Sequence, residues 1–107
     1  MKKAMPKPPR TFEEFSKTFP ALRKAWDMLG DAAKDGPLDE RTVRLVKLGV
    51  DIGAMREGAV HSSARKARAL GVTTGELNQV VAVASSIIGM PTAVAVWTWL
   101  RDSASKK

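Results

Sequence analysis

Residues 73–100 read TTGELNQVVAVASSIIGMPTAVAVWTWL, and this stretch decides the fold class. Thr73 and Glu76 have the spacing of a capping box, in which each side chain binds the other residue's backbone N–H at the start of a helix. The apolar residues that follow recur at intervals of three and four: Leu77, Val80, Val81, Ala84, Ile87 and Ile88. This spacing is typical of one helix face, whereas a strand would alternate apolar and polar residues. Gly89-Met90-Pro91 then predicts a break, and its proline can open a last helix.

Similar signals predict further helices before this stretch. Asp39 is the predicted N-cap of a helix whose apolar residues run through 43–54. The interval Gly53–Gly58 predicts a break or a tight turn. Another helix is expected from about residue 57 to residue 70, and Gly71 suits the turn that ends it.

The N-terminal part is predicted to form two helices. Thr11 and Glu14 have the spacing of another capping box, and the short helix that they start is interrupted by Pro20. Pro20 can occupy the first turn of the second helix, which Gly36-Pro37 ends. We therefore expect an all-α domain of about six helices over residues 11–105.

Three of the predicted helices carry apolar residues on more than one face, at residues 43–54, 77–88 and 93–100. A domain of this size has too little interior to bury all of these faces. Large apolar surfaces on a small protein usually mark an interface. The sequence therefore predicts a homo-oligomer in which copies of the chain cover these faces.

Basic charge is concentrated at the N-terminus. The 107 residues include 18 Lys+Arg and 11 Asp+Glu, a formal net charge of +7. Residues 1–10 hold four bases, three prolines and no acid, whereas residues 11–105 hold 12 bases and 11 acids. We therefore expect residues 1–10 to be a basic, Pro-rich, disordered tail on a single helical domain over residues 11–105. The nearly neutral domain does not favour a nucleic-acid partner.

The chain contains no cysteine. This excludes disulfides, thiolate nucleophiles and cysteine-ligated metals, and it is compatible with a reducing cytoplasm. No apolar run approaches the ~20 residues of a membrane span, and no signal-peptide core follows the basic start. We therefore expect a cytoplasmic protein without membrane contact.

The only histidine, His61, is the main candidate for chemistry. Glu57 and Arg65 lie four residues to either side, so the three side chains share one helix face. A carboxylate beside an imidazole can hold its tautomer for proton transfer, and Arg56 and Arg65 could bind an anionic substrate. The alternative is a surface Glu–His–Arg row that contributes only a few tenths of a kcal/mol per pair.

Metal and phosphate chemistry are not favoured by the remaining residues. One His and one Glu supply too few ligands for a catalytic zinc site, which generally has three protein ligands. Gly49, Gly53 and Gly58 do not have the spacing of a Walker or dinucleotide loop. We therefore expect neither a metal nor a cofactor.

Several motifs, taken in order, resemble a known family. They are Gly36-Pro37-Leu38-Asp39-Glu40-Arg41-Thr42, His61 followed by Ala64 and Ala67, Leu70-Gly71-Val72-Thr73 with Glu76-Leu77, and Gly89-Met90-Pro91-Thr92-Ala93. Over residues 19–100 the chain resembles the carboxymuconolactone decarboxylase family, which shares its fold with the alkylhydroperoxidase-D-like proteins. The resemblance implies an all-α domain that assembles into trimers or hexamers, with the active site near subunit contacts.

The redox branch of this family carries Cys-x-x-Cys-x-x-x-His. When its histidine is placed on His61, its two cysteines fall on Ala54 and Glu57. A dithiol cycle needs thiolate attack and disulfide formation, so thiol peroxidase activity is not expected.

The decarboxylase branch lacks the cysteine pair and retains the histidine. The resemblance therefore implies acid–base decarboxylation of a small carboxylated lactone. His61 is the candidate general acid, Glu57 its orienting partner, and Arg44 or Arg56 the anchor of the substrate carboxylate. The alternative is a redox-inactive relative that acts as a ligand-binding or scaffold oligomer.

Overall fold

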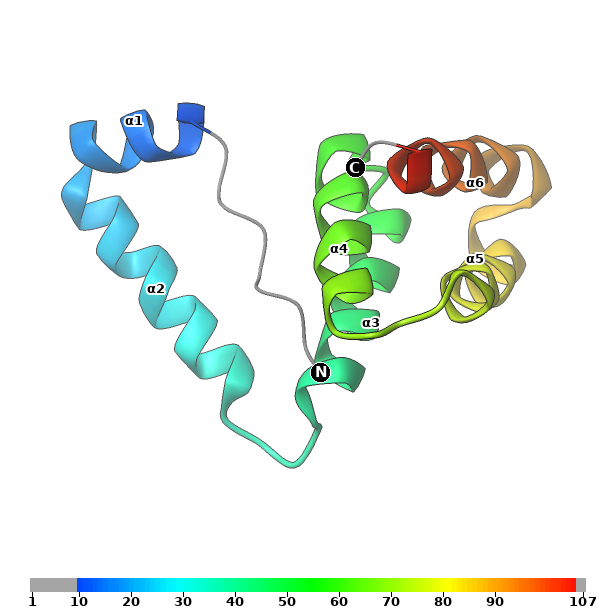
Figure 1. Ribbon diagram of the computed structural model, residues 1–107, viewed down its shortest axis with the longest axis horizontal. Helices are drawn as coiled ribbons and strands as arrows, with labels where there is room; N and C mark the ends of the chain where they lie inside the picture. The colour runs from blue at the N-terminus through cyan, green and yellow to red at the C-terminus, as the bar shows by residue number, and fades with distance from the viewer. Residues whose placement is uncertain (1–9, 106–107) are drawn as a thin grey trace.

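The computed structural model describes residues 10–105 (Figure 1). Within this range the chain forms six helices and no strand: α1 (Arg10–Thr18), α2 (Pro20–Lys34), α3 (Glu40–Gly53), α4 (Glu57–Ala69), α5 (Thr74–Ile88) and α6 (Met90–Ser105). The predicted all-α class is therefore confirmed. The predicted tail lies outside the described residues, apart from Arg10, which belongs to α1. None of the described helices is both long and apolar enough to cross a membrane.

The start of α1 differs from the prediction. The helix begins at Arg10, so Thr11 lies inside the first turn and is not an N-cap. An N-cap residue has non-helical backbone angles, which a residue within the helix does not have. Instead of a capping box, the structure has an exposed ion pair, with Nε of Arg10 3.4 Å from Oε1 of Glu14. Helix α1 therefore already includes Arg10.

Two other predicted helix starts, those of α3 and α5, are confirmed by their caps. The Asp39 side chain accepts a hydrogen bond from the Thr42 backbone N–H at 2.7 Å, at the start of α3. At the start of α5, Thr73 Oγ1 accepts from the Glu76 N–H at 3.1 Å. In return, Glu76 Oε1 accepts from the Thr73 N–H at 2.9 Å, which completes the capping box. These bonds satisfy N–H groups that have no partner inside the helix.

Glycines end two of the helices. Gly71, after α4, and Gly89, after α5, both have a φ of 88°, in the region that favours glycine. Gly89 lets the chain turn directly from α5 into α6, so the two helices pack together. The sequence predicted both turns.

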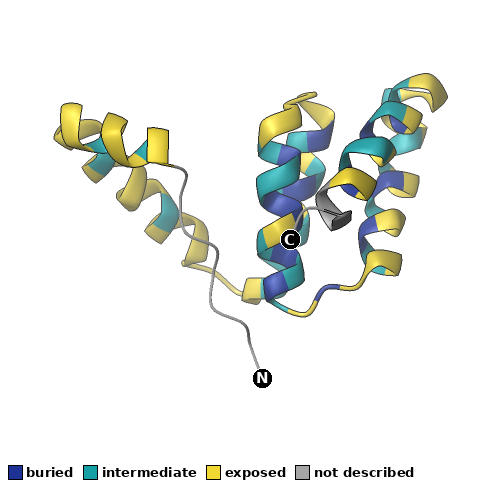
Figure 2. Ribbon diagram, turned by 45° about the horizontal axis from the view of Figure 1, so that its top comes forward, coloured by how far each residue is buried: buried dark blue, intermediate teal, exposed yellow. Residues whose placement is uncertain are grey.

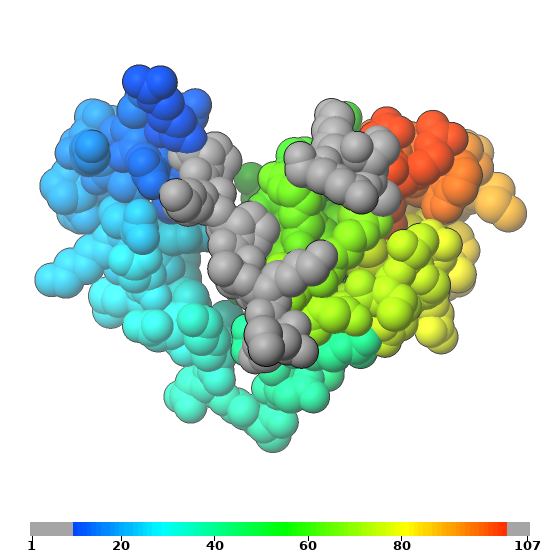
Figure 3. Space-filling view, viewed as in Figure 1, coloured from blue at the N-terminus to red at the C-terminus, as the bar shows by residue number. Residues whose placement is uncertain are grey.

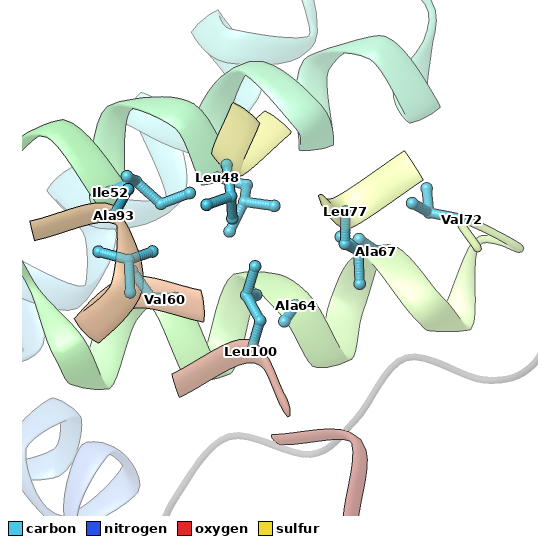
Figure 4. Packing of buried hydrophobic residues seen from close by; sticks show 11 residues of the cluster. Leu48, Ile52, Val60, Ala64, Ala67, Val72, Leu77, Ala93 and Leu100 are labelled. Atoms are coloured by element: carbon cyan, nitrogen blue, oxygen red, sulfur yellow. The ribbon is translucent and has the colours of Figure 1, made fainter. Parts of the chain in front are cut away.

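Helices α3 to α6 form the bundle, which contains the hydrophobic core. Helix α3 packs against α4 and α5, and α6 packs against the same two helices. The largest fully buried side chains come from all four helices: Leu48, Ile52, Leu77, Leu100, Val60 and Val96. Figure 4 shows labelled side chains of this core, such as Leu48, Val60 and Leu100, pointing into the space between the helices. The bundle is therefore the unit whose interior excludes water.

Helices α1 and α2 form an arm that stands beside the bundle (Figures 1 and 3). Within the described residues, no side chain of α1 or α2 is buried, and Figure 2 shows the arm as mostly exposed. Its largest exposed apolar side chains are Phe15, Phe19, Leu22, Trp26, Met28 and Leu29. The arm thus presents apolar surface that the single chain leaves uncovered.

An ion pair joins two helices of the bundle at their N-terminal ends. Arg41 of α3 donates a hydrogen bond from Nη2 to Oε1 of Glu76 on α5. The hydrogen bond from Arg41 and that from the Thr73 N–H lower the pKa of the Glu76 carboxyl to about 2. The same hydrogen bond to Glu76 raises the pKa of Arg41. The Glu76 carboxylate therefore caps α5 and also pairs with Arg41 of α3.

We predict that Glu76→Gln removes an acid-sensitive part of the stability. A glutamate in the unfolded chain titrates near pH ~4.3. Because folding lowers the pKa of Glu76, its contribution is complete at neutral pH and is lost as the pH falls from about 4.3 toward 2. The variant should be less stable at pH 7 and lose less stability over this acid range, as measured by thermal unfolding at several pH values. The exposed Glu13→Gln of α1 is the control, and equal pH profiles for wild type and Glu76→Gln would contradict the prediction.

Candidate functional site

His61 and Glu57 lie side by side on the first turns of α4. Nε2 of His61 is 3.5 Å from Oε2 of Glu57, which is one turn earlier on the same helix. The histidine side chain is only 18% exposed, whereas that of Glu57 is 59% exposed. The spacing of four residues predicted this contact. The pair therefore has a half-buried imidazole, and its carboxylate faces solvent.

The predicted arginines occupy different places around this pair. Arg56 is the N-cap residue of α4 and is exposed, and Arg65 is exposed one turn beyond His61. Arg44 lies on α3, where it lines a hollow together with Lys66 of α4. Lys66 is five residues after His61, which corresponds to about 140° around the helix axis. Arg44 therefore lines the basic side of α4, and among the residues described along this hollow His61 and Glu57 do not appear.

The hollow that Arg44 lines has a volume of about 740 Å³ and lies between the arm and the bundle. We call it the basic hollow, and its walls are formed by Phe12, Arg23, Trp26, Lys34, Leu38, Glu40, Val43, Arg44, Lys47 and Lys66. Five of these side chains are cationic and one is a carboxylate. The hollow therefore combines positive charge with aromatic and aliphatic surface.

Burial and mutual repulsion lower the pKa values of cations in the basic hollow. Burial lowers the pKa of Lys66, and the neighbouring charges of Arg44, Lys47 and Arg65 lower it further. Burial also lowers the pKa of Lys47 and that of Arg44, while the Asp51 carboxylate opposes the change in each. Asp51 itself accepts a hydrogen bond of 2.6 Å from the Ser63 hydroxyl. This carboxylate thus offsets only part of the positive charge.

A second hollow, of about 510 Å³, lies between α3 and α5. We call it the apolar groove, and it is lined by Thr42, Leu45, Val46, Gly49, Gly53, Glu76, Gln79, Val80, Val83, Ala84, Ile87 and Ile88. Its apolar side chains include some of the most exposed in the protein, with Ile87 86% exposed. The residues described along the walls of the two hollows do not include His61.

Sequence reasoning missed Lys47 and Lys66. The available signal was the spacing of Arg44, Lys47 and Asp51, which places three charged residues on one face of a helix that is otherwise apolar after its first turn. That face contacts α4, so Lys66 joins the cluster only through tertiary packing. Within residues 10–105, no group of three or more His, Asp or Glu residues has an arrangement that could hold a metal ion.

The profile of the carboxymuconolactone decarboxylase family matches residues 20–102, from the start of α2 into α6. The chain belongs to this family. Searches of curated proteins and of solved structures found no significant match. In this member of the carboxymuconolactone decarboxylase family, Ala54 follows α3 and Glu57 begins α4, where the redox branch would carry its thiols. Because the chain has no cysteine, it has no dithiol cycle.

We predict that Ser63→Ala destabilises the α3–α4 pair. Ser63 is buried, and its hydroxyl is a hydrogen-bond donor to the half-buried Asp51 carboxylate. Loss of a hydrogen bond to a charged group should lower the free energy of unfolding by about 1–3 kcal/mol, measured by urea denaturation. The neighbouring Ser62→Ala should change it by less than about 0.5 kcal/mol. Equal stability of the two variants would show that this bond contributes nothing.

Proposed function

We propose that this carboxymuconolactone decarboxylase family protein catalyses acid–base decarboxylation of a small carboxylated lactone at His61. The observation that carries the proposal is the 3.5 Å contact between His61 and Glu57, in a chain that the family profile matches over residues 20–102. A half-buried imidazole beside a carboxylate is suited to proton transfer. No thiol is needed for this reaction.

His61 and Glu57 have separate roles in the proposed step. Decarboxylation breaks the bond between the ring carbon and the carboxylate carbon, and the electron pair remains on the lactone as a dienolate. His61, as imidazolium, donates its proton to that carbanionic carbon and then regains a proton from water. Glu57 is in contact with the ring of His61 and fixes its orientation. The reaction releases CO2 and consumes no oxidant.

Arg56 is the proposed anchor of the substrate carboxylate on the same chain. It caps the helix that carries the pair, and its guanidinium is exposed and available to a ligand. A guanidinium can bind a carboxylate through two parallel hydrogen bonds. Arg44, the other predicted anchor, lines the basic hollow and would have to act there or on a second copy.

We further propose that the active form is a homo-oligomer, a trimer or a hexamer. The arm and the apolar groove supply uncovered apolar surfaces on either side of the chain. The proposed assembly would also cover Glu57, which is 59% exposed in the single chain. Exclusion of water strengthens electrostatic interactions at a reacting centre.

A noncatalytic ligand-binding or scaffold oligomer is the second candidate. The observation that favours it is that His61 lines neither the basic hollow nor the apolar groove among the described residues. Such a protein would keep the fold and the assembly without turnover.

We predict that His61→Ala lowers turnover of a carboxymuconolactone by about 10²–10⁴-fold, because the proton donor is lost. The measurement is CO2 release together with the change in ultraviolet absorbance of the lactone. Glu57→Gln should cause a smaller loss, and Ser62→Ala serves as the neighbouring control. Light scattering should give the same mass for all variants. Unchanged turnover in His61→Ala would refute the mechanism, and a wild-type protein without turnover would favour the scaffold.

We predict that Ile87→Asp dissociates the oligomer. A carboxylate in the apolar groove would have to be desolvated when a second copy covers it, and burial of an unpaired charge is costly. Multi-angle light scattering should show multimeric wild type and a smaller species for the variant. Asn78→Asp adds the same charge at an exposed position of α5 and is the control. A monomeric wild type at micromolar concentration would refute the assembly.

A further inference from the structure

We propose that the basic hollow is a binding site for a small apolar carboxylate, separate from His61. The proposal rests on the charge of the hollow, the convergence of its cations and the chemistry of its walls. It is independent of the reaction proposed for His61, because the two places lie on different sides of α4.

Within the described residues, acidic side chains balance only part of the charge of the basic hollow. Arg23 is paired with Asp27, with Nε 3.0 Å from Oδ1. For Lys47 and Lys66, by contrast, no carboxylate of residues 10–105 lies within ion-pair distance. Among the wall residues that the structure describes, Glu40 is the single acidic side chain. The hollow is therefore complementary to an anion.

Three of the cations converge from two helices. Arg44 and Lys47 are one turn apart on α3, and Lys66 comes from the neighbouring α4. All three are partly buried, and their mutual repulsion contributes to the lowered pKa of Lys66. Like charges held together in partly desolvated surroundings destabilise the free protein. A bound carboxylate would offset this repulsion and accept hydrogen bonds from the cluster.

The opposite wall of the hollow is aromatic and belongs to the arm. The rings of Trp26 and Phe12 meet edge to face, with their centroids 6.3 Å apart. Val43 and Leu38 add aliphatic surface. Aromatic faces favour stacking with a flat apolar ligand rather than with a small hydrated ion such as phosphate. The volume of about 740 Å³ also lies in the range typical of small-molecule sites.

The N-terminal segment does not have the composition of a suitable occupant. Residues 1–9 contain three lysines and no acid, so they cannot neutralise the cations. The ligand class that matches both walls is a monocarboxylate with a flat ring. Such a ligand would contact α2 through its ring and α3 and α4 through its carboxylate, so it would join the arm to the bundle.

The test is isothermal titration of the full chain with benzoate, benzyl alcohol and inorganic phosphate. Benzoate should bind, and its affinity should fall as the ionic strength rises. Benzyl alcohol, which lacks the charge, and phosphate, which lacks the ring, should bind at least about tenfold more weakly. Equal affinity for benzyl alcohol would refute the ionic contact. Equal affinity for phosphate would refute the aromatic contact.

Substitutions of the lysines in the basic hollow test whether benzoate binds there. Lys47→Gln with Lys66→Gln should weaken benzoate binding by about tenfold or more, whereas Lys66→Arg should retain it. Lys24→Gln, on the exposed surface of α2, is the control for loss of a lysine charge outside the hollow. Circular dichroism checks that each variant is folded. Equal losses in Lys24→Gln and in the double variant would refute the site.

The variant His61→Ala separates this site from the proposed catalytic one. It should bind benzoate as tightly as wild type, even if its turnover is lost. Trp26→Ala should weaken benzoate binding, because it removes an aromatic face of the hollow. Loss of benzoate binding in His61→Ala would show that the carboxylate binds at the histidine, and it would overturn the proposal of a separate site.

Discussion

The close packing of α3 against α4 is the contact on which the rest of the structure depends. Leu48 and Ile52 of α3 are fully buried, and α4 receives them with small residues such as Ala64 and Ala67, which are also fully buried. Small side chains allow two helices to approach closely. Because the interior is close-packed, a change of even one methylene group at this interface disturbs the packing of the core. The buried Ser63 adds a polar contact to Asp51 at the same interface.

The contact between α3 and α4 also determines which residues α4 presents on each of its sides. With the small residues facing the core, His61 and Glu57 lie on one side of the helix, and Lys66 lies on the other. Lys66 lies near Arg44 and Lys47 only because α3 packs alongside α4. One helix therefore presents a candidate proton donor in one direction and part of a basic hollow in another.

The arm and the bundle differ in how much of their apolar surface is buried. The bundle buries residues from all four of its helices, while within residues 10–34 no side chain is buried. A chain of 107 residues cannot cover every amphipathic face by itself. The exposed Trp26 is therefore available either to a ligand in the basic hollow or to another copy, and the titration and scattering experiments separate these uses.

The sequence by itself determined the helices and most of their ends. Local interactions specify these features, because the capping groups of Asp39, Thr73 and Glu76 lie within three residues of their partners, and Gly71 and Gly89 act on their own backbone. The contact of His61 with Glu57 is local in the same way. The start of α1 was misplaced because a spacing such as Thr11 to Glu14 does not distinguish a cap from a first turn.

Only the tertiary structure decided which charged residues meet. Arg44 and Lys66 are 22 positions apart, and Arg41 and Glu76 are 35 apart, so no periodicity within one helix connects them. Packing also placed Arg44, one of the two candidate anchors, in the wall of the basic hollow together with Lys66. The physical reason is that a helix fixes the angles between its own side chains, whereas the rotation of one helix against another follows from how the whole core is filled.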